Sequence, residues 1–120
     1  MLMNNWIVET LNASVDEELN KLNVKLRAKF IHIAEMIEEL GLENVREPYI
    51  KPLNINANKK VWEIRVKHSN NIARAAYVTV KHKRIIILSV FIKKSTQIPK
   101  LEMAKIFRRL KELETRGDKK

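Results

Sequence analysis

The fold of this chain is decided by residues 61–93, which read VWEIRVKHSNNIARAAYVTVKHKRIIILSVFIK. In VWEIRVK apolar residues alternate with charged ones, which is typical of a strand with one buried and one polar face. HSNN predicts a turn in which Asn70 or Asn71 takes the left-handed conformation. IARAAYVTV predicts a second strand, KHK a tight connection, and RIIILSVFIK a central strand that is apolar on both faces. Three sequential strands with short connections predict an antiparallel meander.

Helical patterns lie on both sides of this meander. WIVETL, residues 6–11, is compatible with a short strand. From Ser14 apolar residues recur at helical spacing; Asn23 is expected to separate two helices, and Gly41 to end the second. From Pro99 a further apolar stripe predicts a C-terminal helix with Arg109 on its polar side. The sequence therefore predicts one α+β domain over residues 1–120, with an N-terminal helical hairpin packed on an antiparallel β-sheet and a C-terminal helix.

Charge is distributed unevenly along the 120 residues. The formal net charge is +10, yet residues 1–50 carry 5 Lys and Arg against 9 Asp and Glu, whereas residues 51–100 carry 12 against 1. A basic half on an acidic half is typical of a polyanion-binding face. The longest nearly apolar run, IIILSVFI at residues 85–92, is far shorter than the roughly 20 residues of a membrane-spanning helix. With no cysteine and no secretory signal, we expect a cytoplasmic protein without a membrane partner.

Five cations of the predicted meander are candidates for one functional cluster. They are Arg65, Lys67, Arg74, Lys93 and Lys94. If the strands pair in order, Arg65, Lys67 and Arg74 lie near one turn. Antiparallel pairing of the third strand then brings Lys93 and Lys94 back towards them. Gathered cations repel one another, so such a cluster indicates an anionic ligand or a lysine with a lowered pKa.

The remaining candidates are aromatic residues and histidines. Tyr77 could stack on a base, although a place in the core is an equally good interpretation, whereas Trp62 is expected in the core. His32 and His82 are expected in solvent, and His68, beside Lys67, is the histidine closest to the cluster. The sequence lacks HExxH and any histidine pair at helical spacing, so no metal site and no cofactor is expected. Two glycines are too few for a phosphate-binding glycine loop.

Four motifs in order carry a resemblance to a known family. EPYIKPL, WEIRV, ARAAY and FIKK, followed by the proline-led helix PKLEMAKIFRRLKELETRG, resemble the HigB branch of the RelE/ParE toxin superfamily, including its phage-derived relatives. The resemblance covers about residues 45–117. Ser89 departs from it by standing where relatives often carry histidine, and Ile98 by standing where threonine would cap the helix.

The resemblance implies a small RelE-like α+β fold and the toxin of a type II toxin–antitoxin system. It implies a metal-independent endoribonuclease that cleaves mRNA on the ribosome and is silenced by a HigA-like helix-turn-helix antitoxin. By position it assigns catalysis to Arg65, Arg74, Lys93 and Lys94, and places Lys67 on the same strand face as Arg65. We expect Lys67, His68 and Tyr77 to contact RNA. Two alternatives remain open: a ParE-like non-catalytic inhibitor of DNA gyrase, and an RNA-binding module without chemistry.

Overall fold

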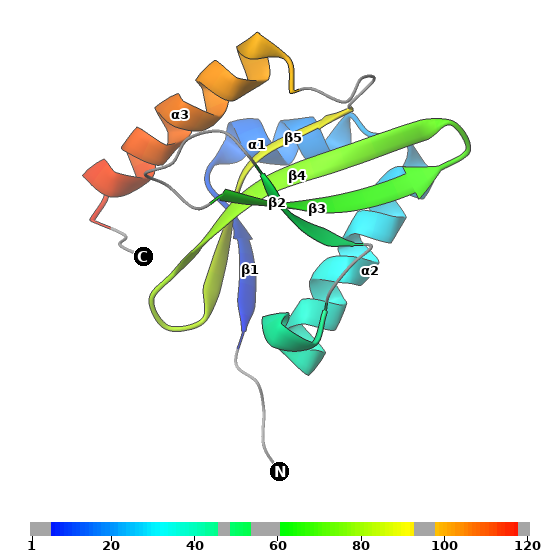
Figure 1. The fold of residues 1–120 in the computed structure, drawn as a ribbon, viewed down its shortest axis with the longest axis horizontal. Coiled ribbons are helices and arrows are strands. Elements are labelled where there is room, and N and C mark those ends of the chain that lie inside the picture. Colours follow the sequence, from blue (N-terminus) through cyan, green and yellow to red (C-terminus); the bar gives the residue numbers. More distant parts are fainter. Residues whose placement is uncertain (1–5, 46–48, 54–60, 93–97, 118–120) are drawn as a thin grey trace.

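A computed structural model of the chain describes residues 6–45, 49–53, 61–92 and 98–117. These residues form three α-helices, a short 3₁₀ helix and one five-stranded sheet, which confirms the predicted α+β class (Figure 1). In chain order the elements are β1 (Ile7–Thr10), α1 (Ala13–Asn20), α2 (Val24–Leu40), η1 (Leu42–Asn44), β2 (Ile50–Leu53), β3 (Val61–His68), β4 (Asn71–Val80), β5 (Arg84–Ile92) and α3 (Lys100–Thr115). No helix among the described residues is long and apolar enough to cross a membrane.

The sheet has the strand order β1-β5-β4-β3-β2, with the predicted meander of β3, β4 and β5 at its centre. The short strand expected near the N-terminus is confirmed as β1, which pairs parallel with β5. The sequence prediction did not include β2, which pairs antiparallel with β3. Its four residues, IKPL, include Pro52, which lacks an amide donor and is therefore tolerated only on an edge strand such as this one.

The two turns of the meander are tight. His68 pairs with Asn71, so Ser69 and Asn70 alone form the first turn. Ser69 has φ 56°, and neither asparagine has a positive φ, so the prediction of a left-handed Asn70 or Asn71 was wrong. A positive φ at the first central residue is the geometry of a type II′ turn, which matches the twist of a hairpin.

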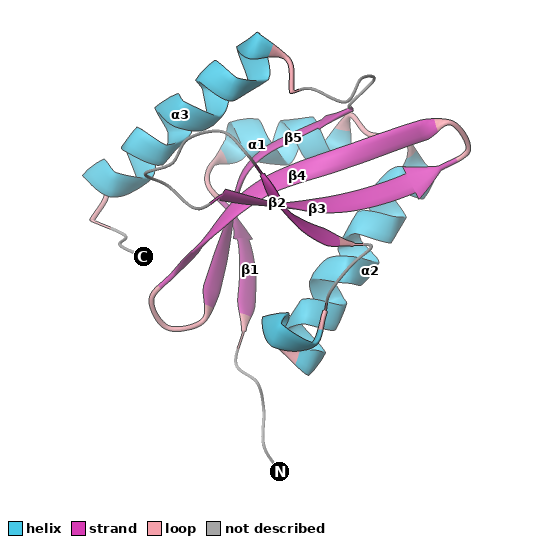
Figure 2. Ribbon diagram, in the orientation of Figure 1, coloured by secondary structure: helices cyan, strands magenta, loops and turns pink. Residues whose placement is uncertain are grey.

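The N-terminal hairpin is confirmed as α1 and α2, which lie behind the sheet in Figure 2. The side chain of Asn12 caps α1 by accepting from the amide of Val15, and that of Asn23 caps α2 by accepting from the amide of Leu26. The helix α2 packs against β3 and β1. Its buried face follows the predicted helical spacing and consists of Leu26, Phe30, Ile33 and Ile37.

The helices α1 and α3 meet at the edge of β5. The β1–β5 ladder ends at Thr10 and Ile87, so the following residues of β5 have no β1 partner. The carboxylate of Glu18 accepts from the amide of Val90, and the guanidinium of Arg109 donates to the carbonyl of Leu88 and to Glu18. Arg109 is 6% exposed, so its predicted place on the polar side of α3 was wrong. Side chains of α1 and α3 thus bind backbone groups at the end of β5 that a neighbouring strand would otherwise pair.

Candidate functional site: a buried carboxylate between two arginines

The ladder between β3 and β4 brings two predicted site residues side by side. Arg65 and Arg74 are directly opposite partners, so their side chains leave the same face of the sheet. Val66 and Ile64, which alternate with Arg65, face the other way and are buried. The meander therefore holds two guanidinium groups together on the face opposite the core contacts of β3.

Glu63 lies between these arginines and holds both. Its carboxylate accepts a hydrogen bond from the guanidinium of Arg74 and lies 3.7 Å from Nε of Arg65. Glu63 is 3% exposed, while the side chains of Arg65 and Arg74 are 27% and 12% exposed. We call these three residues the Glu63 cluster. Its two cations and one anion leave a net charge of +1, and a buried carboxylate of this kind is stable only when it is paired.

Arg74 retains unused hydrogen-bonding capacity inside this cluster. Its Nε is buried and has no hydrogen-bond partner, whereas its NH1 binds Glu63. A guanidinium carries five donors in a rigid planar fork that fits phosphate oxygens. Glu63 therefore fixes the orientation of the fork from one side, and Nε of Arg74 is left without a partner.

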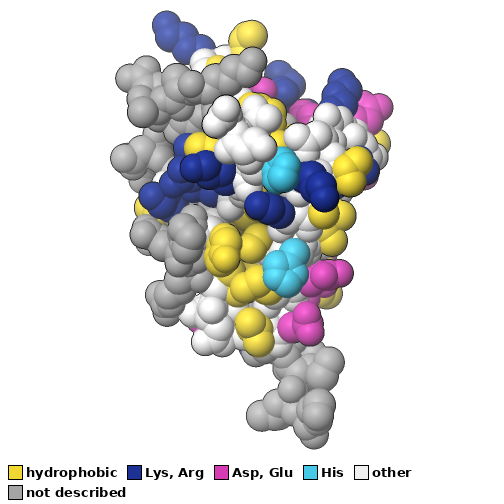
Figure 3. All heavy atoms as spheres, turned by 90° about the vertical axis from the view of Figure 1, so that its right-hand side faces the viewer, with side chains coloured by type: hydrophobic (Ala, Val, Ile, Leu, Met, Phe, Trp, Pro, Cys, Tyr) yellow, Lys and Arg dark blue, Asp and Glu magenta, His cyan; other side chains and the backbone are white. Residues whose placement is uncertain are grey.

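Further cations extend this face beyond the cluster. Lys67 follows Arg65 by two residues on β3, so it shares the arginine face, and it is exposed. Lys51 of β2 lies opposite Glu63 in the ladder and is therefore on the same face. Figure 3 looks at the end of the molecule where the hairpin of β3 and β4 closes; Lys and Arg side chains cross the middle of this view, beside His and hydrophobic side chains. The predicted basic face is thus present on the described residues.

His68 and Tyr77, the other two residues predicted to contact RNA, differ in their exposure to solvent. His68 is half-buried at the last position of β3, one residue beyond Lys67. Tyr77 is 1% exposed and lies opposite Trp62, on the face that packs towards the helices. Burial raises the pKa of its phenol well above its usual range. A stacking platform needs an exposed ring, so the prediction that Tyr77 contacts RNA is corrected to a core position.

Both departures from the family pattern have a structural counterpart. Ser89 is fully buried, and its hydroxyl donates to Glu102 of α3 over 2.9 Å. Ile98 packs against the hydrophobic core, and α3 begins after Pro99 without a side-chain capping bond. Lys93 and Lys94, the remaining predicted catalytic residues, lie outside the described residues.

Sequence reasoning did not identify Glu63 as part of the site. The available signal was that it is the single acidic residue in residues 51–100 and shares the alternating polar face of its strand with Arg65 and Lys67. Its pairing with Arg74 joins two strands, which periodicity along one strand does not reveal. Among the described residues, no group of three or more His, Cys, Asp or Glu is arranged to hold a metal ion.

Comparisons with known proteins agree with this architecture. The family model described as Phage derived protein Gp49-like (DUF891) matches residues 17–111. A chain of the toxin–antitoxin complex RelBE2 from Mycobacterium tuberculosis is similar in structure, with TM-score 0.52, 18% identity and coverage of 78% of this chain and 98% of that chain. A mutant of the E. coli toxin RelE in the free state has TM-score 0.55 and 15% identity, covering 91% of this chain and 98% of that chain. A search of the curated proteins finds no match. At these identities the structural likeness shows a RelE-like fold.

Proposed function

The chain belongs to the Gp49-like family of phage-derived proteins and has a RelE-like fold, and from this we propose that it is the toxin of a type II toxin–antitoxin pair, of the HigB branch, and cleaves mRNA on the ribosome in the cytoplasm. The observation that carries the proposal is the Glu63 cluster. It presents two oriented arginines on a basic sheet face. Of the two similar structures, one is described as the toxin RelE and the other as a toxin–antitoxin complex.

The proposed reaction needs no metal because the nucleophile belongs to the substrate. The 2′-hydroxyl of a ribose loses its proton to a base and attacks the adjacent phosphorus, and the 5′-oxygen of the next nucleotide leaves and takes up a proton. Arg65 and Arg74 stabilise the negative charge that develops on the phosphoryl oxygens. Lys93 and Lys94 are proposed for the proton transfers, since lysine beside other cations is a weaker base and a better acid than free lysine.

The proposed partner is a HigA-like helix-turn-helix antitoxin. A concentrated positive field on a folded domain attracts nucleic acid unless it is covered, so we expect acidic side chains of the antitoxin over the basic face or a segment packed across the helices. Binding of this kind stabilises the toxin by mass action. Co-expression with the neighbouring gene should restore growth to cells that this chain arrests; a chain that is harmless when expressed alone would contradict the toxin proposal.

The direct test is cleavage of mRNA in a purified translation system, mapped by primer extension. Arg74→Ala should lower the cleavage rate by about 10²- to 10³-fold, the loss typical of one oxyanion donor. Arg108→Ala is the matched control because it removes an exposed arginine of α3. Since Arg74→Ala leaves Glu63 with one partner fewer, Arg74→Lys is measured beside it as a variant that keeps the charge.

Cleavage by a correctly folded Arg74→Ala at the wild-type rate would reject the catalytic role of Arg74. The endonuclease itself would be rejected by inhibition of DNA gyrase in a supercoiling assay without any cleavage of mRNA, which would favour the ParE-like alternative. RNA binding without mRNA cleavage and without gyrase inhibition would favour the alternative of an RNA-binding module without chemistry.

A further inference from the structure

A hollow of about 570 Å³ lies between α2 and the edge of β3, beside the Glu63 cluster. It exists because β2 is shorter than β3: the ladder between them begins at Ile50 and Ile64. Among the described residues, one further backbone bond follows, from the amide of Arg65 to the carbonyl of Tyr49, over 2.7 Å. Beyond this bond no described strand pairs with the outer edge of β3, and α2 forms the opposite wall.

The walls of the hollow combine an apolar lining with a basic rim. The apolar part is formed by Ala28, Ile33, Val66 and Ile72. The polar part is formed by Lys29, His32, Tyr49, Arg65 and Lys67. Every charged residue among these is a cation, and none of the described residues of the lining is a carboxylate. A flat, apolar group attached to an anion is the ligand that such walls complement.

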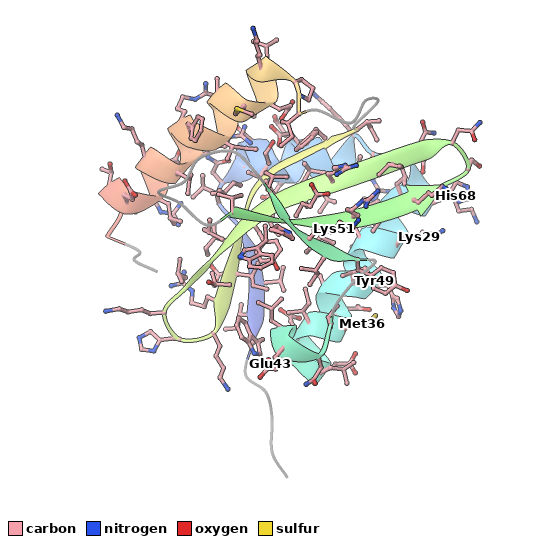
Figure 4. All side chains as sticks on the ribbon, in the orientation of Figure 1. Lys29, Met36, Glu43, Tyr49, Lys51 and His68 are labelled. Atoms are coloured by element: carbon pink, nitrogen blue, oxygen red, sulfur yellow. The ribbon has the colours of Figure 1, made fainter. Side chains whose placement is uncertain are left out.

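Tyr49 supplies the aromatic surface that Tyr77 does not. It is 40% exposed and stands opposite Arg65, so its ring starts from the same edge as a guanidinium of the Glu63 cluster. Figure 4 shows Tyr49 beside α2, at the same end of the molecule as Lys29 and His68. An exposed tyrosine ring next to arginine is a typical stacking platform for a base whose phosphate is held by the cation.

Lys29 fixes the wall that faces this ring. Its ammonium group donates to the carbonyl of Lys67 over 2.7 Å, which ties α2 to the unpaired edge of β3. Among the described residues of the lining, no carboxylate compensates the charge of Lys29. The hollow is therefore held open at one end by a cation that can also attract a phosphate.

We propose that this hollow binds one nucleobase of single-stranded RNA, stacked on Tyr49, while Arg65 holds the neighbouring phosphate. The inference rests on the proposed function, since it takes RNA as the ligand of the basic face. Arg65 lines the hollow and also belongs to the Glu63 cluster, so a base in the hollow would position the adjacent phosphodiester at the arginines. An acidic peptide is the other ligand that a basic, apolar groove attracts, but binding an acidic peptide does not require a flat ring for stacking beside a guanidinium.

The test measures binding of the full chain, without ribosomes, to a short adenosine-containing single-stranded RNA and to the same RNA with abasic nucleotides. Fluorescence anisotropy reports the affinity, and a gel checks that the RNA stays intact. Tyr49→Leu keeps the apolar volume but removes the ring, so it should weaken binding of the base-containing RNA by about 5- to 150-fold, the range for one stacked base. Binding of the abasic RNA should not change, and Tyr49→Phe should bind like the wild type.

Leu101→Ala is the control variant, because Leu101 is a highly exposed apolar side chain on α3, away from the hollow. Equal affinity of wild type and Tyr49→Leu for the base-containing RNA would overturn the proposal, as would an equal loss for both RNAs. If Tyr49→Leu instead releases a co-purified antitoxin and leaves RNA binding unchanged, the occupant is a protein segment and the proposal is wrong.

A second measurement keeps the test independent of folding and of cleavage. In the wild type, the NMR signals of the Tyr49 and His32 rings should shift when the base-containing RNA is added and stay in place with the abasic RNA; identical responses to both RNAs would reject the base site. Failure of the proposed function gives a different pattern. If the protein binds RNA through Tyr49 but never cleaves mRNA, the base site is supported and the endonuclease is rejected. If Tyr49→Leu cleaves mRNA and binds RNA like the wild type, the endonuclease is supported and the base site is rejected.

Discussion

At the scale of single residues, the organisation of the site depends on Glu63. Two guanidinium groups on directly opposite positions of a ladder repel each other, and a carboxylate between them converts this repulsion into attraction. The carboxylate is buried, so removing it leaves two guanidinium groups close together, partly shielded from solvent and without a compensating negative charge. We interpret Glu63 as a positioning residue that orients Arg74 and limits the net charge of the cluster.

Glu63→Gln tests this interpretation because it keeps the side-chain shape and removes the charge. The variant should be less stable by about 1–3 kcal/mol, since a charge-assisted bond is replaced by a weaker one. It should also bind RNA with a steeper salt dependence, by about 0.7 in the slope of log K against log salt for one added phosphate contact. Chemical unfolding and a salt titration of RNA binding measure both. The matched control is Glu35→Gln on the exposed side of α2, and a salt slope equal to wild type would contradict the assignment.

The lysine pair that follows β5 carries a separate prediction. If Lys93 and Lys94 transfer protons, replacing both with Gln should lower mRNA cleavage by about 10²- to 10⁴-fold, the usual contribution of general acid–base catalysis. Stability should stay within about 0.5 kcal/mol or rise slightly, because like charges are removed. A double variant of two exposed lysines elsewhere, Lys81→Gln with Lys111→Gln, controls for lost charge. Equal cleavage by wild type and the Lys93, Lys94 variant would leave this pair the role of a solvated strand end.

At the scale of elements, the open part of the β5 edge is closed by side chains instead of a strand. Glu18 of α1 receives hydrogen bonds from Arg109 and Lys105 of α3 and from the backbone of β5. Burial by itself raises the pKa of Glu18, but these hydrogen bonds and the nearby Arg109 charge outweigh it, so the pKa lies below its ordinary value of 4.5. The ionised form of Glu18 thus joins both helices to the sheet.

Glu18→Gln should therefore destabilise the protein in a pH-dependent way. Because the folded-state pKa is depressed, the stabilisation by Glu18 is fully present above the unfolded-state value near 4.5 and is lost as the pH falls through the folded-state value. The difference in free energy of unfolding between wild type and Glu18→Gln should be largest near neutral pH and shrink below about pH 4.5. Urea unfolding at several pH values measures it, with Glu35→Gln as an exposed control. A difference that is constant with pH would show that the ion pairs of Glu18 contribute nothing.

At the scale of the whole molecule, opposite charges occupy different parts of the fold. Six of the nine acidic residues among the first fifty lie on α1 and α2, behind the sheet, whereas the basic middle of the chain includes β3 and β4, which carry the Glu63 cluster (Figure 1). Such a division orients the protein towards a polyanion, because the approach of the basic face is favoured and that of the helices is not.

RNA binding by the whole protein should weaken steeply as salt rises. Each phosphate contact releases counterions, so several contacts together should lower the affinity by at least about tenfold between 50 and 200 mM salt. The proposed cleavage should persist in EDTA, provided that the ribosomes are first shown to remain intact under the same conditions. A flat salt dependence would argue against the basic face as the contact surface, and loss of activity with intact ribosomes would argue against the metal-independent reaction.

Local patterns in the sequence were sufficient for most of the fold. Period-two alternation predicted β3, the short connections on either side delimited β4, and a continuous apolar run predicted β5. Helical spacing with Asn23, Gly41 and Pro99 as boundaries predicted the helices, because all these signals depend on neighbours along the chain. The placement of Arg65 beside Arg74 also followed, since a short turn between two strands determines their register. Even a short strand such as β1 was visible as an apolar run.

The chemistry of the site was decided by contacts between distant segments. Glu63 is buried and paired with Arg74 of the neighbouring strand, Tyr77 is buried on the face of the sheet that meets the helices, and Tyr49 is exposed just before β2 begins. Arg109 leaves the predicted polar side of α3 because Glu18 and the edge of β5 offer it partners that no local pattern reveals. The sequence by itself determined which elements form and which cations share a face, since both follow from periodicity. Only the tertiary structure decided which polar groups are buried and paired, because burial and pairing depend on residues far away in the chain.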